Sequence, residues 1–169
     1  MHRLLSLLFL AGTVLPPSAL ADPAGNVLTL RSLDEAANRA VVEIDGSFNT
    51  LSISQTALEG TSRPNTMTVS LSGDRNGGGA PQTLLSASPF EGLSWGSLVQ
   101  SGEGNGMSVS VAGSDNLFAA VQSGDANSLT ASMVGDRNQA LVAQFGTSNV
   151  AAFSQVGHGN IVSITQRSW

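Results

Sequence analysis

The chain has 169 residues, a formal net charge of −5 and no cysteine. Its seven basic residues are all arginine, and its twelve acidic residues outnumber them. A chain with this balance lacks the basic surface that nucleic acid requires, so nucleic acid is not expected as a partner. Without cysteine there are no disulfides, and stability has to come from packing and from backbone hydrogen bonds.

Residues 1–21 have the three parts of a secretory signal peptide. A short positive start is followed by the apolar run Leu4–Leu10, and Ala19-Leu20-Ala21 forms a small-x-small cleavage site before Asp22. The apolar run is too short for a membrane helix, which needs roughly 20 apolar residues. We therefore expect a secreted protein whose mature chain begins at Asp22 and contains no integral membrane segment.

Further along the chain, the tetrad Gly-x-x-Asn recurs every eleven residues. Such a constant period indicates that one supersecondary unit is copied and that each copy packs on the next. Glycine permits a positive φ at a corner, and asparagine tolerates left-handed conformations while its amide bonds to nearby backbone. The tetrads are Gly102/Asn105, Gly113/Asn116, Gly124/Asn127, Gly135/Asn138, Gly146/Asn149 and Gly157/Asn160.

Between the tetrads, residues alternate in character with a period of two. After Asn105, the side chains of Met107, Val109 and Val111 share one face, and small or polar residues occupy the other. This pattern predicts one half-buried strand and one corner per unit. We expect an all-β β-solenoid of 11-residue strand-turn half-repeats, with two strands in each 22-residue coil and amyloid-like stacking of the strands.

Glutamine and asparagine recur at twice the tetrad period, so the same side chains return on successive coils. With strands about 4.8 Å apart, each stacked amide can donate to one neighbour and accept from the other. Gln155 departs from the glutamine column and shares the position of Val111 and Met133. The predicted ladders are Gln100, Gln122, Gln144 and Gln166; Asn105, Asn127 and Asn149; and Asn116, Asn138 and Asn160.

The repeat becomes less regular upstream of the tetrads. Asn38 and Asn49 are eleven residues apart, as are Asn65 and Asn76, but an insertion separates the two pairs. Whether residues 22–94 join the solenoid stays open. The expected segments are a leader or degenerate unit at 22–37, degenerate repeats at 38–76, an irregular Gly- and Pro-containing loop at 77–94 and regular repeats at 95–169.

One stretch begins Gln144-Phe-Gly146-Thr-Ser-Asn149-Val-Ala151 and ends at Gln166. It resembles the curlin repeat, whose pattern is Gln-x-Gly-x-x-Asn-x-Ala followed by a further Gln. The similarity covers Gln100–Gln166 well and Asn38–Asn76 in part. It implies inward-facing positions for the ladder amides above, for Gln155, and for Ala140 and Ala151. Val111 and Met133 stand where the family usually has glutamine.

The resemblance also implies a role in bacterial curli, the extracellular amyloid fibres of biofilm and adhesion. A curlin subunit passes through the periplasm, leaves the cell through an outer-membrane export machinery and polymerises at the cell surface with itself or with other curlin subunits. The resemblance does not decide whether the chain is a major subunit, a nucleator or an accessory protein of the fibre. The main alternative is a monomeric secreted β-solenoid that acts as an adhesin or binding module, with capped ends and a varied outward face.

Catalytic chemistry is not expected, because no cluster of acids, nucleophile with base, or metal-ligand set is apparent. His158 lies inside a corner, and neither a metal nor a cofactor is predicted. The aspartates at the corners are expected to cap turns and to keep like charges outside, which would slow premature association. These possible gatekeepers are Asp74, Asp115, Asp125 and Asp136.

Several apolar side chains are expected on the outward face of every second strand. Leu117, Val121, Leu141 and Ile161 occupy these positions. They are either scattered surface residues, which are normal for any protein, or side-by-side contacts between fibres.

Overall fold

The computed structural model describes residues 4–10, 18–21, 25–33, 38–57, 63–78, 89–90 and 92–169. Within these residues all regular secondary structure is β-strand, which confirms the all-β prediction. The strands are β1 (Leu4–Leu10), β2 (Ser18–Ala21), β3 (Val27–Leu33), β4 (Arg39–Asp45), β5 (Thr50–Thr56), β6 (Thr66–Ser72), β7 (Ser97–Ser101), β8 (Gly106–Ala112), β9 (Leu117–Asp125), β10 (Ser128–Val134), β11 (Gln139–Thr147), β12 (Val150–Val156) and β13 (Ile161–Arg167).

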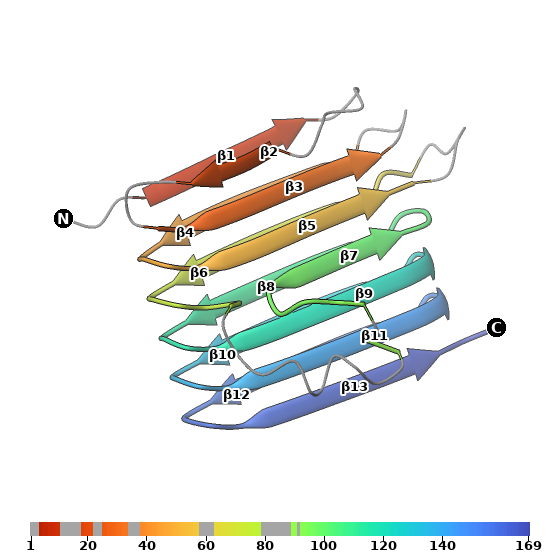
Figure 1. The fold of residues 1–169 in the computed structure, drawn as a ribbon. Helices are drawn as coiled ribbons and strands as arrows, with labels where there is room; N and C mark the ends of the chain where they lie inside the picture. Colours follow the sequence, from red (N-terminus) through yellow and green to blue (C-terminus); the bar gives the residue numbers. More distant parts are fainter. Residues whose placement is uncertain are drawn as a thin grey trace.

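The strands form two sheets that face each other (Figure 1). The six-stranded sheet has the order β1-β4-β6-β8-β10-β12, and the seven-stranded sheet has the order β13-β11-β9-β7-β5-β3-β2. From β3 to β13 the chain alternates between the two sheets, and all neighbours in this stretch are parallel. Two consecutive strands, one in each sheet, are called a coil below.

The upstream strands belong to the same two sheets as the regular repeats. β5 pairs with β7 and β6 pairs with β8, so both sheets continue across the segment that separates β6 from β7. Residues 79–88 and 91 of the predicted loop lie outside the described residues, as do 22–24 and 34–37 of the predicted leader.

The two strands of the predicted signal peptide are arranged differently from the others. β1 runs antiparallel to β4, and β2 runs antiparallel to β3, so both lie at the N-terminal end of the stack. The signal peptide itself stays a prediction, and residues 1–3 and 11–17 lie outside the described part. Where the structure describes the chain, no helix is long and apolar enough to cross a membrane.

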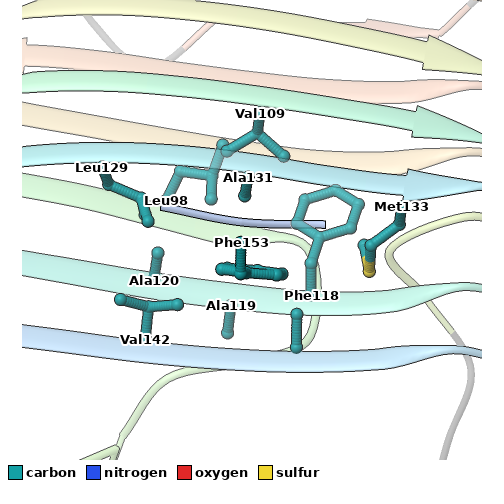
Figure 2. Close-up of a pocket in the computed structure, with 11 residues that line it drawn as sticks. Leu98, Val109, Phe118, Ala119, Ala120, Leu129, Ala131, Met133, Val142 and Phe153 are labelled. Atoms are coloured by element: carbon teal, nitrogen blue, oxygen red, sulfur yellow. The ribbon is translucent and has the colours of Figure 1, made fainter. Parts of the chain in front are cut away.

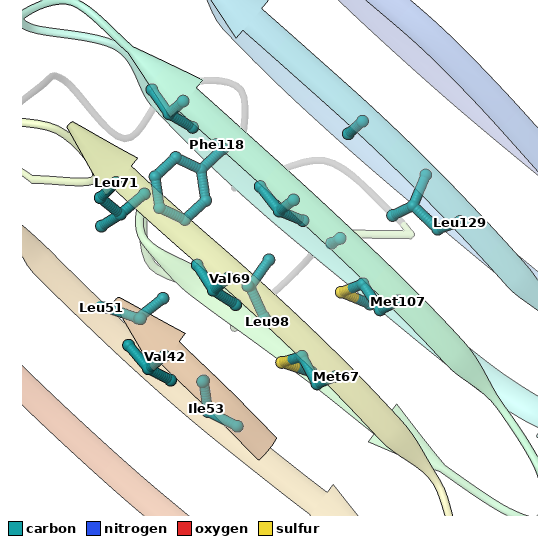
Figure 3. Close-up of a cluster of buried hydrophobic side chains, with 14 of the residues drawn as sticks. Val42, Leu51, Ile53, Met67, Val69, Leu71, Leu98, Met107, Phe118 and Leu129 are labelled. Atoms are coloured by element: carbon teal, nitrogen blue, oxygen red, sulfur yellow. The ribbon is translucent and has the colours of Figure 1, made fainter. Parts of the chain in front are cut away.

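The core lies between the sheets and is built from the second, fourth and sixth residues after each corner asparagine. In the N-terminal and middle coils these positions hold large aliphatic side chains (Figure 3). In the later coils alanine replaces several of them, as at Ala120, Ala131 and Ala140. A gap of about 10 Å³ remains there, close to Phe118 and Phe153 (Figure 2). The gap is lined by apolar side chains, so it offers a water molecule no hydrogen-bond partner.

A second apolar cluster covers the outside of the seven-stranded sheet. Phe90 and Trp95, from the segment before β7, pack on Leu117 and Leu141, which are 7% and 3% exposed. Figure 1 shows the described part of this segment, drawn in green, passing in front of that sheet. Leu117 and Leu141 are therefore neither scattered surface residues nor contacts between fibres, and both predictions are wrong for them. Their side chains do point outward, but the non-repeating segment before β7 buries them.

Candidate functional site

A column of glutamine side chains runs through the interior along the seven-stranded sheet. Each Nε2 donates to the Oε1 of the glutamine on the following coil, with N···O distances of 2.7–2.9 Å. The column consists of Gln55, Gln100, Gln122, Gln144 and Gln166. Gln55 was absent from the predicted ladder, although its place six residues after Asn49 could have identified it.

Interior glutamines use both hydrogens of the side-chain amide. Besides its bond to Gln144, Gln122 donates to the carbonyl of Gly106 at 3.0 Å. Gln144 donates in the same way to the carbonyl of Ser128 at 3.0 Å and to Gln166. A buried primary amide needs partners for its two donors and its acceptor, and the ladder supplies them without any charge.

Two further columns of asparagine line the corners. The backbone N–H of each asparagine donates to the Oδ1 of the asparagine one coil earlier, and in most cases Nδ2 does so too, at 2.8–3.1 Å. One column is Asn38, Asn65, Asn105, Asn127 and Asn149; the other is Asn26, Asn49, Asn76, Asn116, Asn138 and Asn160. The upstream asparagines therefore lie in the same columns as the predicted ones.

The corner glycines allow adjacent coils to approach closely. Gly135 has a φ of 114°, and a Cβ placed on it would overlap the carbonyl oxygen of Gly157 on the next coil. The same approach is found at Gly102, Gly113, Gly124 and Gly146, where the obstructing oxygen belongs to the following coil. Glycine is thus required both by the backbone conformation and by the spacing between coils.

The third residue of the tetrad carries backbone strain that the sequence analysis missed. Asp115, Ala126, Arg137 and Ser148 have φ values between 54° and 59°, in the left-handed region. A residue with a Cβ is disfavoured there by about 1–2 kcal/mol. Glycine occurs at this position as Gly104 and Gly159, with φ of 63° and 69°. The sequence shows glycine at this position in some tetrads and other residues in the rest, and the glycines could have indicated a left-handed conformation there.

Three of the corner aspartates connect neighbouring coils. Asp74, Asp125 and Asp136 each follow a corner glycine, and their Oδ1 atoms accept the backbone N–H of the corner residue one coil earlier. The N···O distances are 2.8, 3.1 and 2.9 Å respectively. Charge-assisted bonds of this kind hold successive corners together. The predicted gatekeeper role is a separate property of these carboxylates and stays a prediction.

The fourth corner aspartate forms an ion pair. Arg75 donates to both carboxylate oxygens of Asp115, at 2.7 and 2.9 Å. This hydrogen-bonded contact lowers the pKa of Asp115 below its ordinary value and raises the pKa of Arg75. The two side chains are 58% and 42% exposed, so solvent screens the pair.

His158 lies in the last corner, where Nδ1 is 3.4 Å from Oδ2 of Asp136. Among the described residues, no group of three or more His, Cys, Asp or Glu side chains could hold a metal ion. The polar groups of this solenoid are used instead for contacts between its own coils.

Gln155 is the exception among the buried glutamines. It lies on β12 in the six-stranded sheet, directly after Met133 of β10 in the stack. Its Nε2 donates to the carbonyl of Gln139 at 3.1 Å, but its Oε1 is buried without a hydrogen-bond partner. It is therefore not part of a ladder within this chain.

The C-terminal end of the stack is open. β12 pairs only with β10 and β13 pairs only with β11, so each strand has one edge without a neighbour among the described strands. Inward side chains that are buried elsewhere, such as Ile164 and Gln166, are half-exposed here, and Asn160 is exposed. An unpaired edge of this kind offers backbone N–H and C=O groups to another strand.

One known family model matches this end of the molecule. Residues 135–167, from the corner before β11 to the end of β13, match the family model described as the curlin-associated repeat. The chain carries a curlin-associated repeat. This confirms the curlin resemblance over residues 135–167. No curated protein and no solved structure matched the chain. The curlin repeat therefore covers the coil whose outer edges are open.

Proposed function

We propose that this chain is a structural component of extracellular curli-like amyloid fibres, and that it acts by stacking end on end with other curlin-type subunits. The observation that carries this proposal is the open edge of β12 and β13 within the curlin-associated repeat. The role is structural and involves no catalysis. Secretion, passage through the curli export machinery and a place in biofilm and adhesion follow from the same proposal.

The side-chain ladders support stacking in the direction of the solenoid axis. In the interior, the Oδ1 of each asparagine accepts from the next coil, so Asn149 and Asn160 direct acceptors toward a coil that would follow them. Gln166 ends the glutamine ladder at the same edge. A parallel strand on β12 or β13 would continue both the backbone pairing and these side-chain bonds, as in cross-β stacking.

The N-terminal end supports the same proposal once the predicted signal peptide is removed. β1 and β2 cover the edges of β4 and β3, and cleavage after Ala21 would open both edges for parallel pairing. On this first coil, the Nδ2 of Asn38 is buried without a hydrogen-bond partner. A preceding coil would supply an asparagine Oδ1 at that position, which is the acceptor that the Nδ2 of Asn105, Asn127 and Asn149 each finds on the coil before it.

The decisive experiment uses two glycines of the last corner. A Cβ at Gly157 meets only Asn160 Nδ2 at 3.5 Å within the chain, but in a stack on a coil with a Gly-x-x-Asn corner it would meet the carbonyl of that corner, as Gly135 does inside the chain. We expect Gly157→Ala to fold and to stop growth at this end, measured by Thioflavin fluorescence and by the cross-β reflection near 4.8 Å.

The matched control is Gly159→Ala in the same corner. A Cβ added to Gly159 would have nothing within 4 Å, and the left-handed conformation of this glycine is the one that Ala126 adopts three half-repeats earlier. This variant should still form fibres. Fibre growth by Gly157→Ala at the wild-type rate would contradict end-on stacking.

A monomeric secreted β-solenoid that serves as an adhesin or binding module is the second candidate. In the uncleaved chain the antiparallel strands β1 and β2 cap the N-terminal end, and this candidate requires that the end stays covered after cleavage. A chain starting at Asp22 that stays monomeric over a wide concentration range, with circular dichroism typical of β-structure, and that does not add to seeds of another curlin-type subunit would support this candidate over the fibre role.

A further inference from the structure

The two ends of the solenoid differ at the sixth position after each corner asparagine. In the seven-stranded sheet this position begins with Ser32, and every later strand has glutamine. In the six-stranded sheet it is apolar from Ile44 to Met133 and becomes glutamine only at Gln155. Both strands of the C-terminal end thus carry glutamine, and neither strand of the N-terminal end does.

Both terminal glutamines have an unused amide hydrogen. Gln155 donates once, to the carbonyl of Gln139, and Gln166 donates once, to the carbonyl of Val150 at 2.8 Å. Gln122 and Gln144 make the equivalent backbone bond and use their second N–H for the Oε1 of a glutamine on the following coil. The C-terminal end therefore has two unused side-chain N–H donors. The same donors of the interior glutamines bind the Oε1 of a glutamine on the following coil.

Another copy of this chain would not supply these acceptors. Because the strands alternate between sheets and both β3 and β13 lie in the seven-stranded sheet, a continuous stack places the next β3 on β12 and the next β4 on β13. Ser32 would then face Gln155, and Ile44 would face Gln166. Isoleucine has no acceptor, and the serine hydroxyl ends well short of a glutamine amide.

The structure already contains one such mismatch. At the step from Met133 to Gln155, the glutamine Oε1 is buried without a partner. Leaving a buried amide group unsatisfied weakens an association by about tenfold for each group. Stacking this chain on itself would add further mismatches of the same kind.

We propose that the C-terminal end of the solenoid selects a coil with glutamine at the sixth position of both strands, which means a different curlin-type subunit rather than another copy of this chain. The inference rests on the proposed end-on stacking and adds the identity of the partner to it. Gln155 and Gln166 are the residues that determine the selection.

The test measures binding to the C-terminal end alone. The chain starting at Asp22 is attached to a surface through its N-terminus, and the soluble probe is the same chain, either wild type or Ser32→Gln, below the concentration at which fibres form. The introduced glutamine would lie beside Gln55 and extend the existing ladder, so this probe should fold. We expect it to bind about tenfold more tightly than the wild-type probe, because it gives Gln155 an acceptor.

A second surface makes the test specific to Gln155. On a Gln155→Met surface the advantage of the Ser32→Gln probe should disappear, whereas a Thr165→Ala surface, altered on the exposed face of β13, should keep it. Three results would overturn the inference. Both probes could bind the wild-type surface equally, neither probe could bind it, or the Ser32→Gln probe could keep its advantage on the Gln155→Met surface. Wild-type fibres without a Ser32→Gln advantage would refute only the selection. The advantage without any fibres of the Ser32→Gln chain would refute only the fibre role.

Discussion

The interior coils and the last coil have the same local conformation but different surroundings. Gly135 and Gly157 have φ values of 114° and 113°, yet only Gly135 lies against the backbone of a further corner. Asn138 is fully buried, whereas Asn160, at the same place in its tetrad, is exposed. The half-repeat thus adopts its backbone conformation without a neighbour on its outer side. Substitutions can therefore test the contact between coils separately from the conformation of the corner.

The largest expected difference is between alanine at the two glycines. Gly135→Ala should lower the free energy of unfolding by about 2–6 kcal/mol, because backbone strain and overpacking against the next corner each contribute about 1–3 kcal/mol. Gly157→Ala should lower it by only about 1–3 kcal/mol, from strain alone. Urea denaturation of both variants measures the difference, and equal losses would mean that the close approach of coils contributes nothing.

The same comparison can be made with glutamine. Gln122→Met removes an acceptor from Gln100 and a donor from Gln144, both fully buried, and should cost about 2–4 kcal/mol. Gln155→Met removes a side chain whose Oε1 has no partner and extends the apolar column of Met133, so it should change stability by less than about 1 kcal/mol in either direction. Thermal or urea unfolding of the two variants provides the measurement. A similar loss in both would show that the ladder gives no extra stability.

The smallest expected effect concerns pH. Amide ladders do not titrate, so the pH dependence of the interior corners comes from pairs such as Arg75 and Asp115. The lowered pKa of Asp115 adds stability that is present above its unfolded pKa of 3.8 and is lost as the pH falls through the lower folded value. In Arg75→Gln, NMR titration should show a higher pKa for Asp115, and the stability difference from wild type should vanish in acid. An unchanged pKa would mean that the ion pair is absent in solution.

Spacing alone predicted the regular part of the fold. A strict period places identical residues on successive coils, so the columns of Asn116, Asn138 and Gln144 followed from counting residues. The same rule applied to the upstream repeats, but an insertion hid the phase between Asn49 and Asn65. The pairing of β5 with β7 shows that an interrupted repeat can return to the same register.

Contacts made by segments without the repeat could not be predicted in this way. Phe90 and Trp95 cover the outward face of β9 and β11, and no periodicity relates them to Leu117 or Leu141. The antiparallel pairing of β1 with β4 is equally independent of the repeat. Periodic sequence specifies contacts between copies of the unit, whereas tertiary packing of a unique segment depends on the whole surface that it meets.

The alternation of strands between the two sheets has a geometric consequence for any longer assembly. Since β3 and β13 lie in the same sheet, each added subunit would be turned by about half a rotation relative to the one before it. The aromatic cover formed by Phe90 and Trp95 would then appear alternately on opposite flanks. A filament built in this way would have two equivalent sides, each carrying this cover on every second subunit.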